Sequence, residues 1–284
     1  MTLKAWLAKA QKENWALPHF NFSNLEMLKA LVQAAEEARS PMMVGTSEGE
    51  RNFTGLREAV FMVESFREEF RVEIFLNADH SKSVAAAKEA IDAEYDSVHI
   101  DLSALGLAEN IRGTKEVVEY AKKTSVEGEL GYLPGESKIQ KKKFKLKPED
   151  LTNPDEAARF VRETGVDRFA GAFGNIHGIS LDEPALDIER IKAVRKALSE
   201  DIAMVLHAGS GIPDEEIKAA IKAGISNIHI STELRAEFRD ELEKSLHKKG
   251  EAEYAPYKIM GPVVQAIKEK AIEKIKLFGA ENRV

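Results

Sequence analysis

The sequence predicts a (β/α)8 barrel, and three observations lead to this fold class. Short apolar or β-branched runs alternate with longer segments whose apolar residues recur every three or four positions, as in amphipathic helices. The runs follow one another at roughly 25 to 40 residues, which is the period of a strand–helix unit. No Pro/Gly/Ser-rich linker divides the 284 residues. We therefore expect one barrel domain over residues 1–284, with extra N- and C-terminal helices.

Eight runs are the predicted barrel strands. They are a weaker first run at 18–22, followed by 41–46, 72–76, 97–100, 126–130, 168–173, 202–206 and 226–230. A doubly wound open sheet is the competing topology. No G-x-G-x-x-G turn follows the first run, which disfavours a dinucleotide-binding version of that fold.

The segments between the runs carry helix signals. Asn24 precedes an apolar series at 25–35, and its side chain can accept a backbone N–H of the opening turn. Pro213 opens another helix, which Gly224 ends. Residues 256–278 are expected to form a final helical region.

Composition excludes several classes of protein. With 43% hydrophobic residues the chain can build a large core, and it has neither a run of ~20 apolar residues nor a signal-peptide pattern. Cysteine is absent, which removes disulfides, thiolate metal sites and cysteine nucleophiles. The net charge of −7 disfavours a nucleic-acid partner. We expect a cytoplasmic protein with no membrane and no nucleic acid among its partners.

Three histidines stand at the ends of three predicted strands. His80, His177 and His207 follow the runs at 72–76, 168–173 and 202–206. A barrel brings the carboxyl ends of its strands to one face, and three imidazoles without thiolates suit Zn²⁺. The alternative is that each histidine satisfies backbone groups at a strand end. Asp79, beside His80, is either an acid/base group or a helix N-cap.

Two turns after the last strands can bind phosphate. Gly209, Ser210 and Gly211 lead into one predicted helix, and Ser231 and Thr232 open the next. Helix N-termini attract phosphate, and barrels commonly place a phosphate site after strands seven and eight.

The remaining histidines and one basic run receive structural interpretations. We expect His19, His99 and His247 to be structural or solvated, and the lysine-rich run at 141–147 to be a solvated face.

Four motifs in order resemble one known family. They are Asp79-His80, Glu127-Gly128-Glu129-Leu130-Gly131, His177-Gly178 and His207-Ala208-Gly209-Ser210-Gly211. Together they resemble the class II, zinc-dependent fructose-bisphosphate and tagatose-bisphosphate aldolases, and the likeness covers nearly the whole chain.

The resemblance implies a metal site and a catalytic base. Zinc would be held by His80, His177 and His207, with Glu129 as a ligand in an alternative position. Another divalent metal is an alternative to zinc, and a monovalent cation is a further candidate. Asp79 would take the C4 hydroxyl proton while the metal stabilises the enediolate left when the C3–C4 bond breaks.

The resemblance also implies a substrate frame. The positions near the dihydroxyacetone phosphate half are Asn21, Ser47, Gly178, Gly209, Ser210, Ser231 and Thr232. Arg235 would reach the distal phosphate of a substrate bound to a neighbouring subunit, so a homodimer or homotetramer is expected.

Two further positions depart from the family pattern. His229 stands where the family has an asparagine, and strand alternation turns it with Asn227 and Ser231 toward the barrel interior. It would donate a hydrogen bond to the enediolate or its phosphate, unless it is a buried structural histidine. Glu136 is the one acid in the segment 134–138, where the family has a mobile loop. It would move the enediolate proton, or else be a solvated loop residue.

The predicted function is therefore a reversible, metal-dependent aldolase of carbohydrate metabolism and glycolysis. It would cleave a ketose bisphosphate to dihydroxyacetone phosphate and an aldehyde phosphate. Fructose 1,6-bisphosphate is the default substrate and tagatose 1,6-bisphosphate the alternative. A non-catalytic ligand-binding member of the family is the other possibility.

Overall fold

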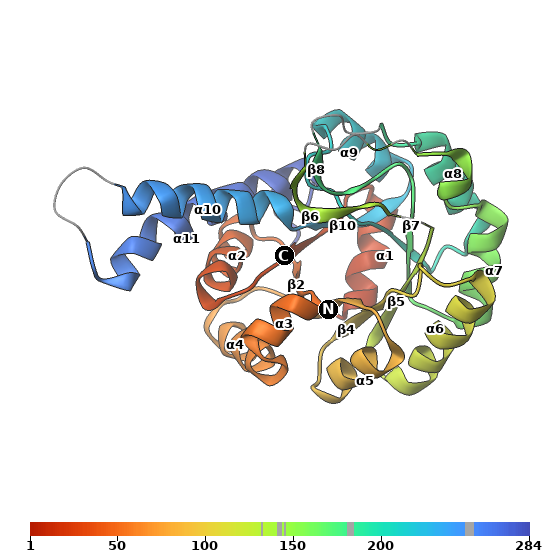
Figure 1. Cartoon of the computed structure of the whole chain (residues 1–284), viewed down its shortest axis with the longest axis horizontal. Coiled ribbons are helices and arrows are strands. Elements are labelled where there is room, and N and C mark those ends of the chain that lie inside the picture. Colours follow the sequence, from red (N-terminus) through yellow and green to blue (C-terminus); the bar gives the residue numbers. More distant parts are fainter. Residues whose placement is uncertain (132, 141–143, 145, 181–184, 248–252) are drawn as a thin grey trace.

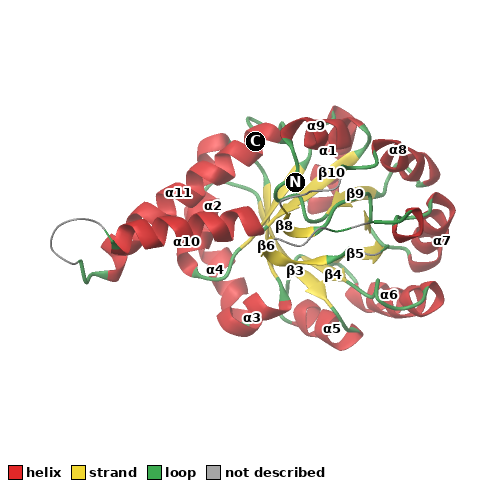
Figure 2. Ribbon diagram, turned by 45° about the horizontal axis from the view of Figure 1, so that its top comes forward, coloured by secondary structure: helices red, strands yellow, loops and turns green. Residues whose placement is uncertain are grey.

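Eight parallel strands close into a barrel in the part of the chain that the structure describes. This computed structural model describes residues 1–131, 133–140, 144, 146–180, 185–247 and 253–284. The strand order is β1-β10-β9-β7-β5-β4-β3-β2, and Figure 2 shows the strands at the centre with helices around them. The predicted (β/α)8 fold is confirmed.

All eight predicted runs form barrel strands. Their bounds are β1 (Leu17–Asn21), β2 (Met42–Thr46), β3 (Ile74–Ser81), β4 (Ser97–Ile100), β5 (Ser125–Leu130), β7 (Arg168–Gly171), β9 (Ala203–Leu206) and β10 (Ile225–Ile230). The predicted and observed boundaries differ most at the end of β3, which continues to Ser81. Asp79 and His80 therefore lie in the last residues of this strand rather than in the following loop.

Helices cover the outside of the barrel. They are α1 (Leu3–Glu13), α2 (Leu25–Ala38), α3 (Glu48–Thr54), α4 (Leu56–Glu69), α5 (Val84–Asp92), α6 (Leu107–Ala121), α7 (Pro154–Thr164), α8 (Ile188–Ala197), α9 (Asp214–Lys222), α10 (Thr232–Leu246) and α11 (Pro256–Leu277), with a 3₁₀ turn at Pro148–Asp150. In this part of the chain, no helix has the length and apolar character needed to cross a membrane.

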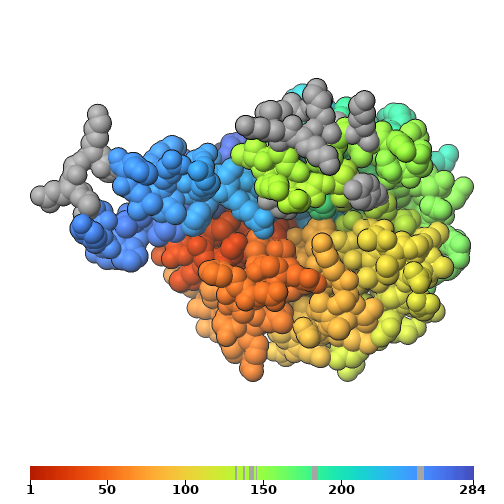
Figure 3. Space-filling model, viewed as in Figure 1, coloured from red at the N-terminus to blue at the C-terminus, as the bar shows by residue number. Residues whose placement is uncertain are grey.

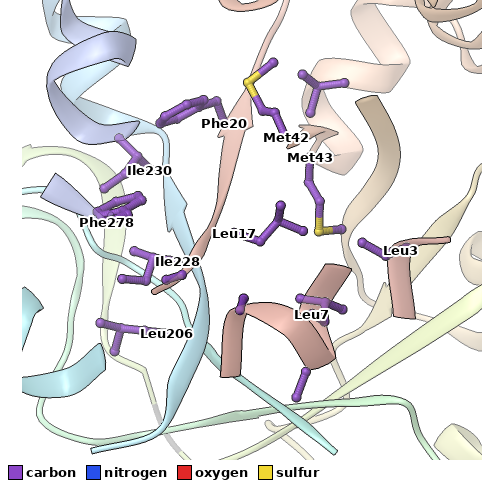
Figure 4. Close-up of a cluster of buried hydrophobic side chains, with 14 of the residues drawn as sticks. Leu3, Leu7, Leu17, Phe20, Met42, Met43, Leu206, Ile228, Ile230 and Phe278 are labelled. Atoms are coloured by element: carbon purple, nitrogen blue, oxygen red, sulfur yellow. The ribbon is translucent and has the colours of Figure 1, made fainter. Parts of the chain in front are cut away.

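The apolar core lies mainly between the strands and the helices. Ile228 and Ile230 of β10 point outward, and Figure 4 shows them beside Leu206 and Phe278. The alternation predicted for β10 is therefore correct, and it leaves Asn227 and His229 facing inward.

The two terminal helical regions have different positions. α1 packs against β1, β9 and β10, and its Leu3 and Leu7 share an apolar cluster with Leu17 and Met43 (Figure 4). α10 and α11 pack against each other, and α11 also packs against α2. Figures 1 and 3 show this helical arm extending beyond the barrel wall.

A second, two-stranded sheet lies outside the barrel. It pairs β6 (Gly135–Gln140) with β8 (His177–Ser180). Where the family has a loop, this chain therefore has a strand that begins at Gly135, and His177 begins another strand rather than lying in the loop after β7. β6 escaped prediction because its charged and polar residues lack an alternating apolar pattern.

A helix cap gives a test of the predicted local structure. The side chain of Asn24 accepts the backbone N–H of Met27 at 3.0 Å, as expected. Asn24→Ala should lower the free energy of unfolding by ~1 kcal/mol because this N–H loses its partner. Chemical denaturation measures the change. Asn24→Ser should retain most of the stability, and an alanine variant as stable as the natural chain would contradict the capping role.

Candidate active site

The inward-facing polar side chains form a cavity at the carboxyl ends of the strands. Its volume is about 130 Å³. The predicted site residues on its wall are Asn21, Ser47, Asp79, His80, His177, Gly178, Ser210, His229, Ser231, Thr232 and Arg235. A larger cavity, of about 710 Å³, adjoins it and shares Ser47, His80 and His177. The structure thus brings most of the predicted residues to one place.

His80 occupies an irregular end of β3. The register between β3 and β4 shifts between Ala78 and Ser81, and His80 has a φ of +47°, which is in the left-handed region. A non-glycine residue in that region carries strain, which is frequent at functional sites. The ring Nδ1 lies 3.0 Å from Asp101 Oδ2, so a carboxylate orients this imidazole.

The rings of two predicted metal ligands, His177 and His207, lie close to that of the third, His80. The His80 ring centroid lies 5.0 Å from that of His177 and 4.7 Å from that of His207. His177 is held by β8, where its backbone N–H donates to Pro134 O at 2.8 Å. The next residue, Gly178, has a φ of +93°, and a Cβ there would meet Glu136 O at 2.3 Å. Glycine is therefore required beside His177.

A fourth imidazole joins this cluster. His99, on β4, is completely buried, and its ring lies 4.6 Å from His80 and 4.5 Å from His207. Among the described residues, the ligand atoms of Asp79, His80, His99 and His207 lie within 4.8 Å of one another, whereas His177 is outside this group. His99 was expected to be structural or solvated, and the structure shows it to be a buried neighbour of the predicted ligands.

The charge state of the cluster suits a divalent cation. Burial lowers the pKa of His177 and His207 to about 4, so both imidazoles are neutral and have a free lone pair at neutral pH. Among the described residues, Asp79 Oδ1, His99 Nε2 and Glu129 Oε2 are buried without a hydrogen-bond partner. The neutral imidazoles of His177 and His207, together with carboxylate oxygens that accept no hydrogen bond, form a donor set that fits a metal such as Zn²⁺.

Asp79 is held as an ionised carboxylate. Its Oδ2 accepts the Asn21 side-chain amide at 3.0 Å, and His229 Nδ1 lies 3.4 Å from its Oδ1. Burial opposes ionisation, but the neighbouring histidines His80, His229 and His99 outweigh it, and the pKa of Asp79 lies well below its usual value. An ionised carboxylate on the cavity wall can accept a proton from a substrate hydroxyl.

His229 faces the cavity from β10. Its ring stacks on His19 at a centroid distance of 3.6 Å and an angle of 8°, and its Nε2 lies 3.2 Å from Asn227 Oδ1. Burial, together with the neighbouring His207, lowers the pKa of His229 to about 3, so the ring is neutral. The lone pairs of stacked rings lie in separate parallel planes, so one ion cannot lie in the plane of both His19 and His229.

The beginning of α10 also faces the cavity. Ser210 Oγ accepts the backbone N–H groups of Ser231 and Glu233, both at 3.3 Å. Thr232, the first residue of α10, lies on the cavity wall. The backbone N–H of Gly209 donates to His229 O at 2.9 Å, so it has no free hydrogen for a phosphate. The helix N-terminus and its two serines therefore form the anion-attracting part of the site.

Arg235, one turn into α10, brings a positive charge to the cavity. Its guanidinium pairs with Glu50 at 2.6 Å, and Glu50 also accepts the Asn21 amide at 2.9 Å. The backbone N–H of Ser47 donates to the same carboxylate at 2.8 Å. Glu50, which sequence reasoning missed, thus links three predicted substrate residues.

The two predicted outer carboxylates differ in environment. Glu129, at the end of β5, is buried, and its Oε2 lies 3.3 Å from His99 Nε2. The side chain of Glu136 is 72% exposed and pairs with Lys138 at 2.8 Å. Both residues line the larger cavity, so Glu136 is near the site but does not touch the inner group of imidazoles.

A match to the class II fructose-bisphosphate aldolase family extends over residues 1–283. The chain belongs to this family. Its members are metal-dependent aldehyde-lyases, and the membership supports an enzyme over a non-catalytic binding protein.

Individual relatives agree with this assignment. The chain is 36% identical to a Staphylococcus aureus protein named fructose-bisphosphate aldolase, over 100% of this chain and 98% of the relative. It is also 36% identical to the uncharacterized protein YdjI of Escherichia coli, over 99% and 98% of the two chains. The crystal structure of the YdjI aldolase superimposes with a TM-score of 0.86 at 35% identity, and covers 99% of this chain and 98% of that one. A Campylobacter jejuni fructose-bisphosphate aldolase, 20% identical with a TM-score of 0.83 over 99% and 95% of the chains, shares the fold.

The charge of His80 gives a pH prediction. Burial opposes its protonation, but Asp79, Asp101 and Glu129 outweigh burial and raise the pKa of His80 above its usual value. At a given pH, His80 of the metal-free protein is therefore protonated more often than a histidine with the usual pKa. That proton must leave before the ring can bind a metal. Zinc affinity should rise as pH increases through this raised pKa, with proton release on binding.

Calorimetric zinc titrations in two buffers of different ionisation enthalpy, on either side of neutral pH, measure this release. The number of protons released per zinc should fall when the pH is raised above the pKa of His80. His247→Gln, which alters an exposed histidine, should leave this pH dependence unchanged. Zinc binding without proton release in the natural chain would contradict the assignment.

Proposed function

We propose that this aldolase uses Zn²⁺ to cleave a ketose 1,6-bisphosphate, by default fructose 1,6-bisphosphate, to dihydroxyacetone phosphate and an aldehyde phosphate. The observation that carries the proposal is the closeness of the His177 and His207 rings to that of His80, at 5.0 and 4.7 Å, beside an ionised Asp79 on the cavity wall. Another divalent metal is the alternative at the same ligands, and Glu129 is a ligand for an alternative position. When bound, the metal supplies a Lewis acid that stabilises negative charge on substrate oxygens.

Asp79 acts as the base for cleavage. It accepts the C4 hydroxyl proton as the C3–C4 bond breaks, C4 becomes the aldehyde carbon, and the bonding electrons remain on the dihydroxyacetone phosphate fragment as an enediolate. The Asn21 amide fixes the carboxylate orientation through its 3.0 Å hydrogen bond. In condensation the same group returns the proton.

The phosphate of the dihydroxyacetone half binds at the beginning of α10. Ser210, Ser231 and Thr232 supply hydroxyl groups there, and the helix dipole favours the anion. Gly178, Gly209, Ser47 and Asn21 complete the frame around this half. A monovalent cation is an additional candidate at this phosphate.

Two residues act on the enediolate, one by a hydrogen bond and one by proton transfer. His229, on the cavity wall and 3.4 Å from Asp79, donates a hydrogen bond to the enediolate or its phosphate. Glu136, on the wall of the larger cavity, moves the enediolate proton. Its hydrogen bond and ion pair with Lys138 lower the pKa of its carboxyl, and its exposure lets it exchange protons with water.

The choice between the two sugars depends on C4, beside Asp79. Fructose and tagatose 1,6-bisphosphates differ only in the configuration of that carbon, so the orientation of Asp79 discriminates between them. Tagatose 1,6-bisphosphate is therefore the alternative substrate. Either activity belongs to carbohydrate metabolism, with glycolysis the setting for fructose 1,6-bisphosphate in the cytoplasm.

The helical arm supports a homodimer or homotetramer. Three large apolar side chains are exposed near the end of α10 and the beginning of α11. They are Leu246, Tyr254 and Tyr257, which are 59%, 86% and 75% exposed. Large apolar side chains gathered on a projecting element are typical of an interface. In such an assembly Arg235 would reach the distal phosphate of a neighbouring subunit's substrate.

The function is tested by measuring bound zinc and triose phosphate release together. The purified chain should hold about one zinc per subunit and release triose phosphate from one of the two sugars, and a chelator should abolish the reaction. Asp79→Asn should retain zinc but slow cleavage ~10²–10⁴-fold, because it loses the base. Metal analysis and a coupled assay give both values.

Two matched histidine changes provide the control. His80→Gln should lose zinc and activity together, whereas His247→Gln, at the exposed end of α10, should lose neither. Normal turnover by Asp79→Asn would refute its role, and zinc-bound protein inactive toward both sugars would refute the proposed substrates.

His229→Asn tests the contact proposed for this histidine. If His229 donates to the enediolate, the change should lower kcat by up to ~10²–10³-fold, the value of a single oxyanion donor. Steady-state kinetics with both sugars measures the effect. Unchanged kcat and KM, together with a shift only in thermal stability, would show that His229 is structural.

A further inference from the structure

A buried ion pair lies inside the barrel beneath the imidazoles. Arg168 of β7 and Glu127 of β5 are partners in the strand register, and neither side chain is exposed to solvent. Arg168 Nη1 lies 2.7 Å from Glu127 Oε2. The pair is not part of the cavity wall, so it does not contact a substrate bound there.

The guanidinium is fixed by side chains of several other strands. It donates to Asn77 Oδ1 of β3 at 3.1 Å and to Asn227 Oδ1 of β10 at 3.2 Å, and it also donates to Ser97 Oγ of β4. A cation without access to water requires such partners, because its desolvation penalty is large. These bonds leave Arg168 little freedom to move, so the position of Glu127 is fixed as well.

The second oxygen of Glu127 reaches a predicted metal ligand. Glu127 Oε1 lies 2.5 Å from His207 Nε2. Its other oxygen, Oε2, lies 2.7 Å from the Arg168 guanidinium, and this ion pair holds Glu127 as a carboxylate. An ionised carboxylate can only accept hydrogen bonds, so the hydrogen must belong to the imidazole.

This contact selects one tautomer of His207. Because Nε2 carries the hydrogen that Glu127 accepts, Nδ1 is left with the free lone pair. In known metal sites, a carboxylate that accepts the second N–H of a ligating histidine fixes its tautomer and ring orientation and makes it a stronger ligand. The ring then has only one nitrogen to offer to a metal.

We propose that Arg168 and Glu127 are positioning residues for the metal site, which hold His207 as the Nε2–H tautomer with Nδ1 directed to the metal. This inference rests on the proposed zinc site. It goes beyond that site because it assigns a task to two buried residues that touch neither metal nor substrate.

The experiment removes the pair without leaving a buried charge. Arg168→Met alone would strand Glu127 and can prevent folding, so the main variant is the double change Glu127→Leu/Arg168→Met, since an apolar replacement of a whole buried pair is commonly tolerated. Competition with a chromophoric chelator should show zinc affinity ~10–100-fold weaker than in the natural chain, the usual effect of losing an outer partner of a ligand. Glu127→Gln, which keeps an acceptor but loses the charge, should weaken binding less.

A matched control separates positioning from stability. Phe169, the neighbour of Arg168 on β7, is buried on the opposite side of the strand against Phe160. Phe169→Leu should lower the melting temperature without changing zinc affinity. A loss of affinity as large in Phe169→Leu as in the double variant would overturn the proposal.

A second measurement does not require metal. Nitrogen-15 NMR of the metal-free natural chain should show His207 with hydrogen on Nε2, and the double variant should show a mixture of tautomers. A hydrogen on Nδ1 in the natural chain, or zinc affinity unchanged in the folded double variant, would overturn the inference. Loss of binding beyond ~10³-fold on Glu127→Gln would also overturn it, because Glu127 would then be a ligand itself. If the natural chain binds no zinc, the proposed function fails, while the tautomer result still tests the contact.

Discussion

The need to neutralise a positive charge inside a closed barrel organises the centre of this protein. Arg168 has no access to water; Glu127 balances its charge, and side-chain oxygens of β3 and β10 accept its N–H groups. Removing two charges from water costs several kcal/mol for each ion, so the pair persists only where its geometry is nearly complete. The barrel supplies that geometry, because its parallel strands direct alternate side chains to the same axis.

The same interior connects the buried pair to the chemistry above it. Glu127 reaches His207, whose ring contacts those of His80 and His229. His80 and His229 in turn lie beside Asp79, whose pKa they depress. The imidazoles and carboxylates therefore form one continuous layer, in which each member depends on the charge of the next. Within the described part of the chain, several polar atoms of this layer have no hydrogen-bond partner, and such atoms are costly to bury unless a bound group satisfies them.

The sequence predicted the barrel and most of the cavity wall from local patterns. β-branched runs indicated the eight strands, and the residues that follow them, such as Asp79 and His207, are those that a barrel must gather at one face. The alternation of β10 correctly placed His229 inside. These inferences required only the order of residues along one strand or one turn.

What escaped prediction depends on neighbours that are distant in sequence. Arg168 and Glu127 are 41 residues apart in the sequence, and they come into contact only through the register of β5 and β7. In the sequence His99 has the pattern of a core histidine, and only the fold shows that β3 and β5 place Asp79 and Glu129 beside it. β6 carries no apolar alternation, and it becomes a strand because β8 pairs with it. Tertiary contacts, which no single segment encodes, determine these features.

The account is tested most directly by a crystal structure of the zinc-loaded chain with anomalous data collected at the zinc absorption edge. We predict one strong peak at ~2.0–2.1 Å from a nitrogen of each of His80, His177 and His207. The His207 nitrogen should be Nδ1, with Nε2 still bonded to Glu127. A peak bound by His99 in place of His177, a peak bound directly by Glu127, or no peak at these histidines would contradict the account.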